Sequence, residues 1–209
     1  MKYMKTVLPV LLFTAATGFA WPSGRAEQSG GQRIYNIGDT GPAGGTVFYD
    51  KGSFSDGWRY MEVAPASADF RAEWGAYQKD VPGTDTSVGS GRRNTLLIVD
   101  YLNRAGEKDR AAQRCVALNI NRFSDWFLPS KDELNLMYAN LSGEGENFEE
   151  KSRRREILAG LRFNTDDGVC YLSSSQYFSD VAWVQSFSGG GMGTGSKRVT
   201  HSVRAVRAF

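Results

Sequence analysis

Side chains able to carry out catalysis are scarce in this 209-residue chain. His201 is the only histidine, so any Ser–His or Cys–His catalytic pair would have to use it. The chain has no G-x-S-x-G segment, the turn that exposes a nucleophilic serine in many hydrolases. Its only two cysteines, Cys115 and Cys170, fall short of a four-ligand structural zinc site even with that histidine. We therefore predict a protein that is not an enzyme and that needs neither a cofactor nor a metal.

Two further motifs have simpler explanations than ligand binding. Asp166 and Asp167 precede Gly168, and Asp-Asp-Gly is more typical of a turn than of a cation site. The segment Gly190–Lys197 is rich in glycine, as phosphate-binding loops are, but it ends Gly-Ser-Lys where such a loop needs Gly-Lys-Ser or Gly-Lys-Thr. We expect a turn at the first motif and no nucleotide at the second.

A run of three arginines, Arg153–Arg155, could bind a phosphate or a sulfated sugar. Glu149 and Glu150 lie four residues before two of these arginines, which is the spacing of ion pairs along a helix. This pattern favours a solvated helix over Phe148–Leu161 rather than an anion site.

The residues best suited to bind a ligand lie near the end of the chain. A segment rich in glycine and serine separates two strand-like runs, Ala182–Phe187 and Val203–Phe209. A loop held between fixed strands is a common way to build a binding surface, and aromatic and arginine side chains are favoured anchors there. We predict ligand contacts on the surface Gln176–Ser202, from Gln176, Tyr177, Phe178, Asp180, Gln185, Ser188, Met192, Lys197, Arg198 and His201.

Within that surface, Tyr177 and Phe178 are the strongest candidates, because they follow three serines in what we interpret as an exposed turn. Trp183 lies inside the first strand-like run and is expected to be structural. The glycines at 189–191, 193 and 195 leave this loop few side chains, which favours weak binding.

Strands at the two ends of the chain must hold this surface in place. We expect a strand over Thr46–Asp50 and a partner over Trp58–Val63, joined by a loop of several residues with a turn at Asp56-Gly57. The segment 69–93 shows no clear period and is expected to be a long, partly ordered loop. A chain that ends on Phe209 within a strand-like run indicates that the last strand is tied into a sheet.

Helices are expected between these strands. A helix over Asn94–Leu102 with Asn94 as its N-cap precedes a second over Lys108–Leu118, either continuous with it or broken near Gly106. A third helix over Lys131–Asn140 has the strongest signal. Ser130 and Glu133 form a capping box before its apolar residues. The order of strands, helices and strands predicts an α+β fold whose N- and C-terminal strands pair.

The first twenty residues resemble a secretory signal peptide. Lys2 and Lys5 precede the apolar run Val7–Phe13, which is too short to span a membrane, and small residues close the segment. We predict a signal peptide over 1–20, a flexible leader over 21–33 and one domain over 34–209. The exported protein would remain in the periplasm, reach the cell surface or be secreted. No later segment is apolar enough to span a membrane.

Charge excludes one class of partner. The chain has 25 Lys and Arg against 23 Asp and Glu, so loss of Lys2 and Lys5 leaves 23 against 23. A neutral chain has no bulk attraction to nucleic acid. In an oxidising compartment Cys115 and Cys170 form either a disulfide or two separate buried thiols.

Seven phrases occur in order along residues 34–209: IGDTGPAGGTVFYDKG, GWRYMEVAP, GSGRRNT, DWFLPSKDELNLMY, YLSSS, AWVQSFS and VRAVRAF. Together they resemble the family of exported bacterial domains best known as the C-terminal domain of the Lcl collagen-like adhesin. This resemblance implies a C-type-lectin-like fold, of the branch shared with formylglycine-generating enzymes, with two or three helices packed on twisted antiparallel sheets. It also implies an adhesin that binds a host or environmental glycan or a surface protein.

The tail also resembles the variable region of proteins diversified by diversity-generating retroelements, in which a lectin-like frame holds replaceable contact residues. This sequence departs from the Lcl family at Leu172, where that family usually has Trp, and it lacks the collagen-like stalk. Two other functions remain open: a structural envelope protein without a specific ligand, and a vestigial enzyme of the formylglycine-generating type.

Overall fold

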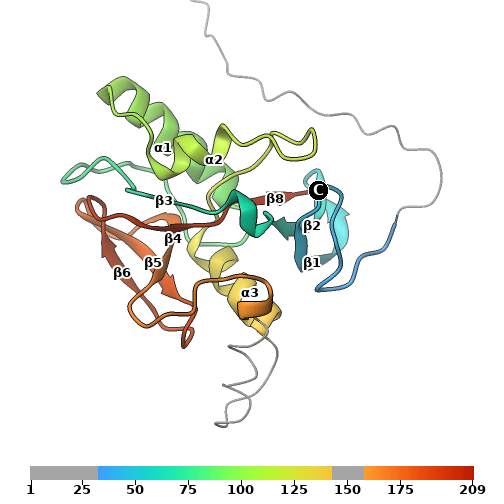
Figure 1. Ribbon diagram of the computed structural model, residues 1–209. Helices are drawn as coiled ribbons and strands as arrows, with labels where there is room; N and C mark the ends of the chain where they lie inside the picture. The colour runs from blue at the N-terminus through green and yellow to red at the C-terminus, as the bar shows by residue number, and fades with distance from the viewer. Residues whose placement is uncertain (1–32, 143–157) are drawn as a thin grey trace, which may run out of the picture.

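A computed structural model describes residues 33–142 and 158–209 and shows an α+β fold with two β-sheets and three named helices in that part of the chain (Figure 1). The strands are β1 (Thr46–Ser55), β2 (Trp58–Val63), β3 (Phe70–Ala72), β4 (Cys170–Gln176), β5 (Val181–Ser186), β6 (Met192–Ser196), β7 (His201–Val203) and β8 (Val206–Ala208). The helices are α1 (Gly91–Ala105), α2 (Ala111–Val116) and α3 (Lys131–Ser142), with a short 3₁₀ turn at Ala66–Ala68.

The smaller sheet joins the two ends of the described chain in the order β1-β2-β8. Strand β8 runs antiparallel to β2, with Val206 opposite Val63 and Ala208 opposite Met61. The N- and C-terminal strands therefore share a sheet, as predicted, and the neighbour of the last strand is β2 rather than β1. The β1–β2 turn is tighter than expected. Ser55 pairs with Trp58 across only Asp56 and Gly57, and both turn residues have a positive φ, which matches the right-handed twist of the strands.

The larger sheet has the strand order β3-β7-β4-β5-β6. Two of its strands correct the sequence prediction. Strand β3 lies within the segment expected to be a loop, and β6 lies within the glycine-rich segment, where it pairs along β5 from Val181–Ser196 to Gln185–Met192. Glycine is a poor strand former, so only pairing with β5 makes this segment extended.

The predicted last strand, Val203–Phe209, is in fact two strands in different sheets. Arg204 lies between β7 and β8, and its buried guanidinium forms an ion pair with Asp69 and donates to the carbonyl oxygens of Leu161 and Arg162. This ion pair fixes the corner at which the chain leaves one sheet for the other.

The helices follow the predicted order with shifted ends. Helix α1 begins at Gly91, so Asn94 is not its N-cap but a buried residue of the first turn. The helix stops where Gly106 adopts φ 75°, which resolves the open question of continuity with α2. At α3 the capping box is confirmed: Glu133 N donates to Ser130 Oγ at 3.2 Å, and Ser130 N donates to Glu133 Oε2 at 2.7 Å.

Two clusters of buried apolar side chains form the core. One surrounds Trp74, Trp126 and Leu102, and the other joins Phe48, Met137 and Phe187, where α3 packs against β1, β4 and β5. Cys115 and Cys170 are free thiols, and burial raises the pKa of each. The disulfide alternative is therefore not the one seen.

Several predictions concern residues outside the described ones: the signal peptide over 1–20, the leader over 21–33 except for its last residue, and all but the end of the helix over Phe148–Leu161. Within 33–142 and 158–209, no helix is both long enough and apolar enough to cross a membrane.

Candidate functional site

Three aromatic rings gather on one face of the larger sheet at the β4–β5 turn. Tyr177 is 47% exposed and Phe178 is 62% exposed, and their ring centroids are 4.4 Å apart. The ring of Tyr177 also meets the half-buried ring of Trp183 edge-on, at 4.9 Å. We call Tyr177, Phe178 and Trp183 the aromatic platform. Exposure of neighbouring large aromatic rings is the usual mark of a binding surface.

The turn that carries the platform is held by backbone hydrogen bonds. The N–H groups of Tyr177 and Phe178 both donate to Val181 O, at 3.1 Å each. Strand alternation then decides the face of each β5 side chain, because Ala182 and Val184 are buried in the core and Trp183 lies on the opposite face.

Polar side chains border the platform. Lys131 Nζ lies 5.2 Å from the centroid of the Trp183 ring and 2.9 Å from Asp132 Oδ1. Thr194 is exposed and lies directly opposite Trp183 in the β5–β6 register. The surface therefore offers ring faces for apolar contact together with an ammonium, a carboxylate and a hydroxyl group for hydrogen bonding.

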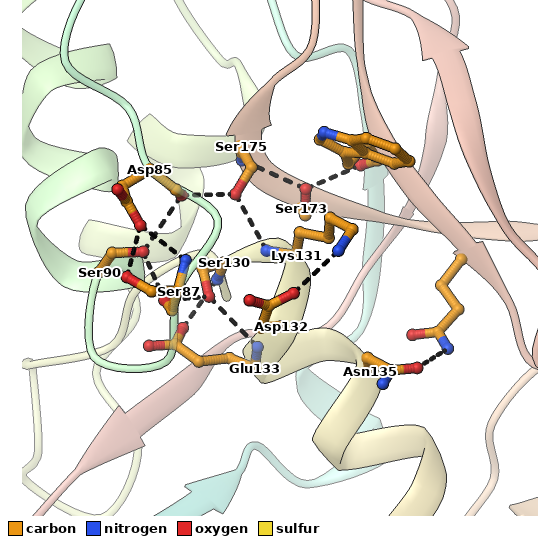
Figure 2. Close-up of polar contacts among 12 residues, drawn as sticks. Asp85, Ser87, Ser90, Ser130, Lys131, Asp132, Glu133, Asn135, Ser173 and Ser175 are labelled. Atoms are coloured by element: carbon orange, nitrogen blue, oxygen red, sulfur yellow. Dashed lines mark hydrogen bonds and ion pairs between the residues drawn. The ribbon is translucent and has the colours of Figure 1, made fainter.

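Buried serines fix the strand behind the platform. Ser173 Oγ donates to the Trp183 carbonyl oxygen at 2.8 Å, which ties β4 to β5 at the platform itself. Ser175 Oγ accepts from Lys131 N at 3.0 Å and donates to Asp85 O at 2.7 Å (Figure 2). The three serines before the exposed turn are thus buried in β4, where their hydroxyl groups join α3 and the loop before α1 to the sheet.

A buried carboxylate completes this support. Glu133 Oε1 accepts from Gly89 N at 2.8 Å and from Gly91 N at 3.3 Å. Its other oxygen accepts from Ser130 N (Figure 2). Burial raises the pKa of Glu133 to about 7, and the hydrogen bonds from these backbone groups oppose that rise. A Cβ at Gly91 would lie 2.1 Å from Glu133 Oε2, so the helix must begin with glycine here.

Two of the predicted contact residues are not on the surface. Lys197 is 0% exposed, and its ammonium donates to Lys79 O at 2.9 Å and to Gln176 Oε1 at 2.6 Å over the ring of Trp74. Burial lowers the pKa of Lys197 to about 8. Gln185 is also buried and donates to Asn135 Oδ1. Both residues correct the prediction, because each side chain holds segments of the fold together rather than facing a ligand.

Two more predicted residues are partly covered. Gln176 is half-buried, and its side-chain oxygen also accepts from Val81 N at 2.9 Å. His201 is half-buried with its Nε2 covered and unpaired, where a Cβ at Gly195 would meet it at 2.5 Å. Burial, and then the charge of Arg71, lower the pKa of His201, so the imidazole is neutral at pH 7.

The other predicted residues lie at the two ends of the β5–β6 pair, with Asp180 and Arg198 near the β4–β5 turn and Ser188 and Met192 at the β5–β6 turn. Asp180 and Arg198 are exposed, with the Arg198 guanidinium 4.8 Å from the Tyr77 ring centroid. Met192 and Ser188 are half-buried, and Ser188 Oγ lies 2.9 Å from Ser186 Oγ. These placements leave the ligand-binding role of the exposed residues a prediction.

Sequence reasoning missed Lys131 and Thr194 and assigned Trp183 to the frame. The alternation of side chains along β5 could have revealed that Trp183 faces away from the core, since Ala182 and Val184 are better core residues. Lys131 and Thr194 had no such signal, because their place depends on how α3 and β6 pack. In the described ranges no group of three or more His, Cys, Asp or Glu side chains is placed to hold a metal ion.

Comparison with known proteins gives little further identification. No protein-family model matches the chain, and no curated protein is similar enough to count as a relative. Among solved structures, the chain is similar to a fimbrial protein from Bacteroides ovatus ATCC 8483, with 14% sequence identity and a TM-score of 0.48. The similarity covers 72% of this chain and 36% of that protein, so this chain spans about a third of its length.

Proposed function

We propose that this protein is an exported, non-catalytic binding protein of the adhesin type, which recognises a glycan or a protein through its aromatic platform. The observation that carries this proposal is the exposure of Tyr177 and Phe178 beside the half-buried Trp183. A folded domain seldom leaves two adjacent aromatic rings in water unless they bind something.

Rigid support favours recognition over a fortuitous hydrophobic patch. The hydroxyl group of Ser173 holds the Trp183 backbone, and Ser175 holds the start of α3, where Lys131 borders the platform. A preorganised surface loses less conformational entropy when it binds, so even a small patch can be selective.

Ring faces with nearby polar groups suit a sugar ring or an aromatic or aliphatic side chain of a protein. The resemblance to the Lcl C-terminal family, its C-type-lectin-like fold and export by a signal peptide belong to the same proposal. Under a diversity-generating retroelement, the exposed platform residues would be among the replaceable positions, while the serines of β4 together with Arg204 and Arg207 would be the frame.

A binding screen tests the proposal. The domain from residue 34 onward is applied to a glycan array and to a panel of extracellular matrix and cell-surface proteins, beside a variant carrying Tyr177→Ala and Phe178→Ala. Phe54→Ala is the matched control, because Phe54 is 56% exposed on β1, and Figure 1 shows β1 on the opposite side of the molecule from β5. A ligand that all three proteins bind equally well would place the binding surface elsewhere.

A further inference from the structure

Strand β6 is an open edge of the larger sheet. It is the last strand in the order β3-β7-β4-β5-β6 and lies at the outer side of the molecule in Figure 1. Natural edge strands are usually protected by a charged side chain or a proline. The β6 sequence Met-Gly-Thr-Gly-Ser has neither of these two.

The backbone groups on that edge can be identified from the ladder. Ser186 N donates to Gly191 O and Lys197 N donates to Asp180 O, each at 2.9 Å. Bonded and non-bonded pairs alternate along an antiparallel ladder, so the bonded pairs between these two involve Gly193 and Gly195. The N–H and C=O groups of Met192, Thr194 and Ser196 therefore point away from β5.

These outward groups have almost no backbone partners within residues 33–142 and 158–209. Only Ser196 O accepts a backbone hydrogen bond, from Val199 N at 3.0 Å. A carbonyl oxygen has two lone pairs, so it can accept a second bond. The edge is thus a row of three residues, spaced by two, whose backbone can pair with another extended strand.

We propose that a second copy of this chain pairs with this edge, β6 against β6 in antiparallel orientation, around a two-fold axis at Thr194. This register uses all three outward residues: Thr194 pairs with Thr194 of the second copy, and Met192 pairs with its Ser196. The sequence suits such pairing because glycines lie on both sides of the central threonine. Cross-strand Thr–Thr pairs are also favourable.

The charge of Arg198 favours antiparallel over parallel pairing of the two β6 strands. Arg198 is exposed two residues beyond β6. In the antiparallel pair, residue 198 of one copy lies opposite the glycine turn at 190 of the other, which carries no charge. A parallel arrangement would instead bring the two Arg198 side chains together, and like charges directly opposite destabilise a pair of strands.

Pairing in this way has a consequence for ligand binding. Side chains of directly opposite residues lie on the same face, so the row across the dimer reads Trp183, Thr194, Thr194 and Trp183. Both aromatic platforms then lie on one face of a continuous sheet. A dimer would bind a ligand with repeated epitopes more tightly than one copy does.

Self-association of the domain tests the proposal by analytical ultracentrifugation over a concentration series into the millimolar range. Thr194→Pro removes one outward N–H and keeps the Gly193 and Gly195 bonds to β5, so it should raise the dissociation constant of the dimer at least ~10-fold. Thr194→Val, which keeps the N–H, should dimerise like the wild type. A monomeric wild type throughout the series, or a Thr194→Pro variant that dimerises equally well, overturns the proposal.

Cysteine cross-linking tests the register even if the proline variant fails to fold. Directly opposite residues of a bonded pair have Cα atoms about 5.5 Å apart, which suits a disulfide. In a Cys170→Ser background, Thr194→Cys should form a disulfide-linked dimer under mild oxidation. Met192→Cys alone should not, whereas Met192→Cys mixed with Ser196→Cys should. Equal cross-linking by Met192→Cys alone contradicts the two-fold axis at Thr194.

Discussion

The substitution Lys197→Met tests most clearly whether a residue predicted to contact the ligand is instead part of the fold. Wild-type Lys197 is buried with its ammonium bonded to Lys79 O and Gln176 Oε1, and burial lowers its pKa from 10.5 to about 8. Methionine keeps the length and apolar volume of the side chain but removes the charge and the donors. Gln176 Oε1 keeps its bond from Val81 N in the variant, whereas Lys79 O loses its partner.

The sign of the pH effect follows from linkage. Between pH 8 and 10.5 the folded state has lost the Lys197 proton, while the unfolded state still holds it. The unfolded state then binds more protons, so the free energy of unfolding rises with pH across this window. From pH 7 to pH 10 the gain is about 2 kcal/mol for this group. Lys197→Met should lack that gain.

Urea denaturation of both proteins at pH 7, 8, 9 and 10 measures this difference directly. Other groups titrate in the same range, so the relevant quantity is the difference between the two proteins and not the slope of either one. At pH 7 the lost donors and the relieved burial of a charge oppose each other, which makes a single pH uninformative. Parallel pH profiles for the two proteins would refute the burial of Lys197. Loss of ligand binding without a change in the pH profile would make it a contact residue after all.

Two further substitutions test the frame that holds the platform. Glu62→Ala should lower the free energy of unfolding by about 3–5 kcal/mol. The substitution leaves the buried Arg207 short of a partner and removes the acceptor of Ala43 N and Gly45 N. A loss below about 1 kcal/mol in chemical denaturation would contradict this network. Gly190→Ala should cost about 1–3 kcal/mol, since its φ is 75° and the new Cβ would lie 2.3 Å from the Tyr138 ring. Gly189→Ala is the control, because a Cβ at position 189 has no atom within 4 Å. This variant should change the free energy of unfolding by less than about 0.5 kcal/mol. Equal effects of the two variants would refute the steric argument.

Local signals predicted the parts of the fold that depend on nearby residues. Ser130 and Glu133 formed the capping box, and Asp56-Gly57 formed the turn. Each of these depends on contacts within a few positions, which a single sequence displays. The pairing of the chain ends was also predictable, because strand-like runs at both ends suggested a shared sheet.

Long-range contacts explain the parts that could not be predicted. The tail strand divides at Arg204 because its guanidinium pairs with Asp69, 135 positions away. Strand β6 is extended because it pairs with β5, against the tendency of its glycines. Lysine is usually a surface residue, and the burial of Lys197 depends on distant partners that include the carbonyl oxygen of Lys79, the amide of Gln176 and the ring of Trp74.

The candidate site was predictable only where its signal lay in neighbouring residues of the sequence. Tyr177 and Phe178 could be chosen from the sequence because two aromatic residues after a run of serines stand out locally. Lys131 could not, since it reaches the platform only when α3 packs beside β5. Gln185 alternates onto the platform's face of β5, but Asn135 of α3 covers it, and strand alternation alone does not reveal such cover.

The most direct test of the central claim is the affinity of the aromatic platform for the ligand identified by the binding screen. Isothermal titration should compare the wild type with Tyr177→Ala, Phe178→Ala and the control Phe54→Ala, each checked for an unchanged melting temperature. Truncation of a ring at the centre of a binding surface costs more than about 1 kcal/mol, so each platform variant should bind at least about 5-fold more weakly. Phe54→Ala should bind like the wild type. Unchanged affinity in both platform variants would contradict the account.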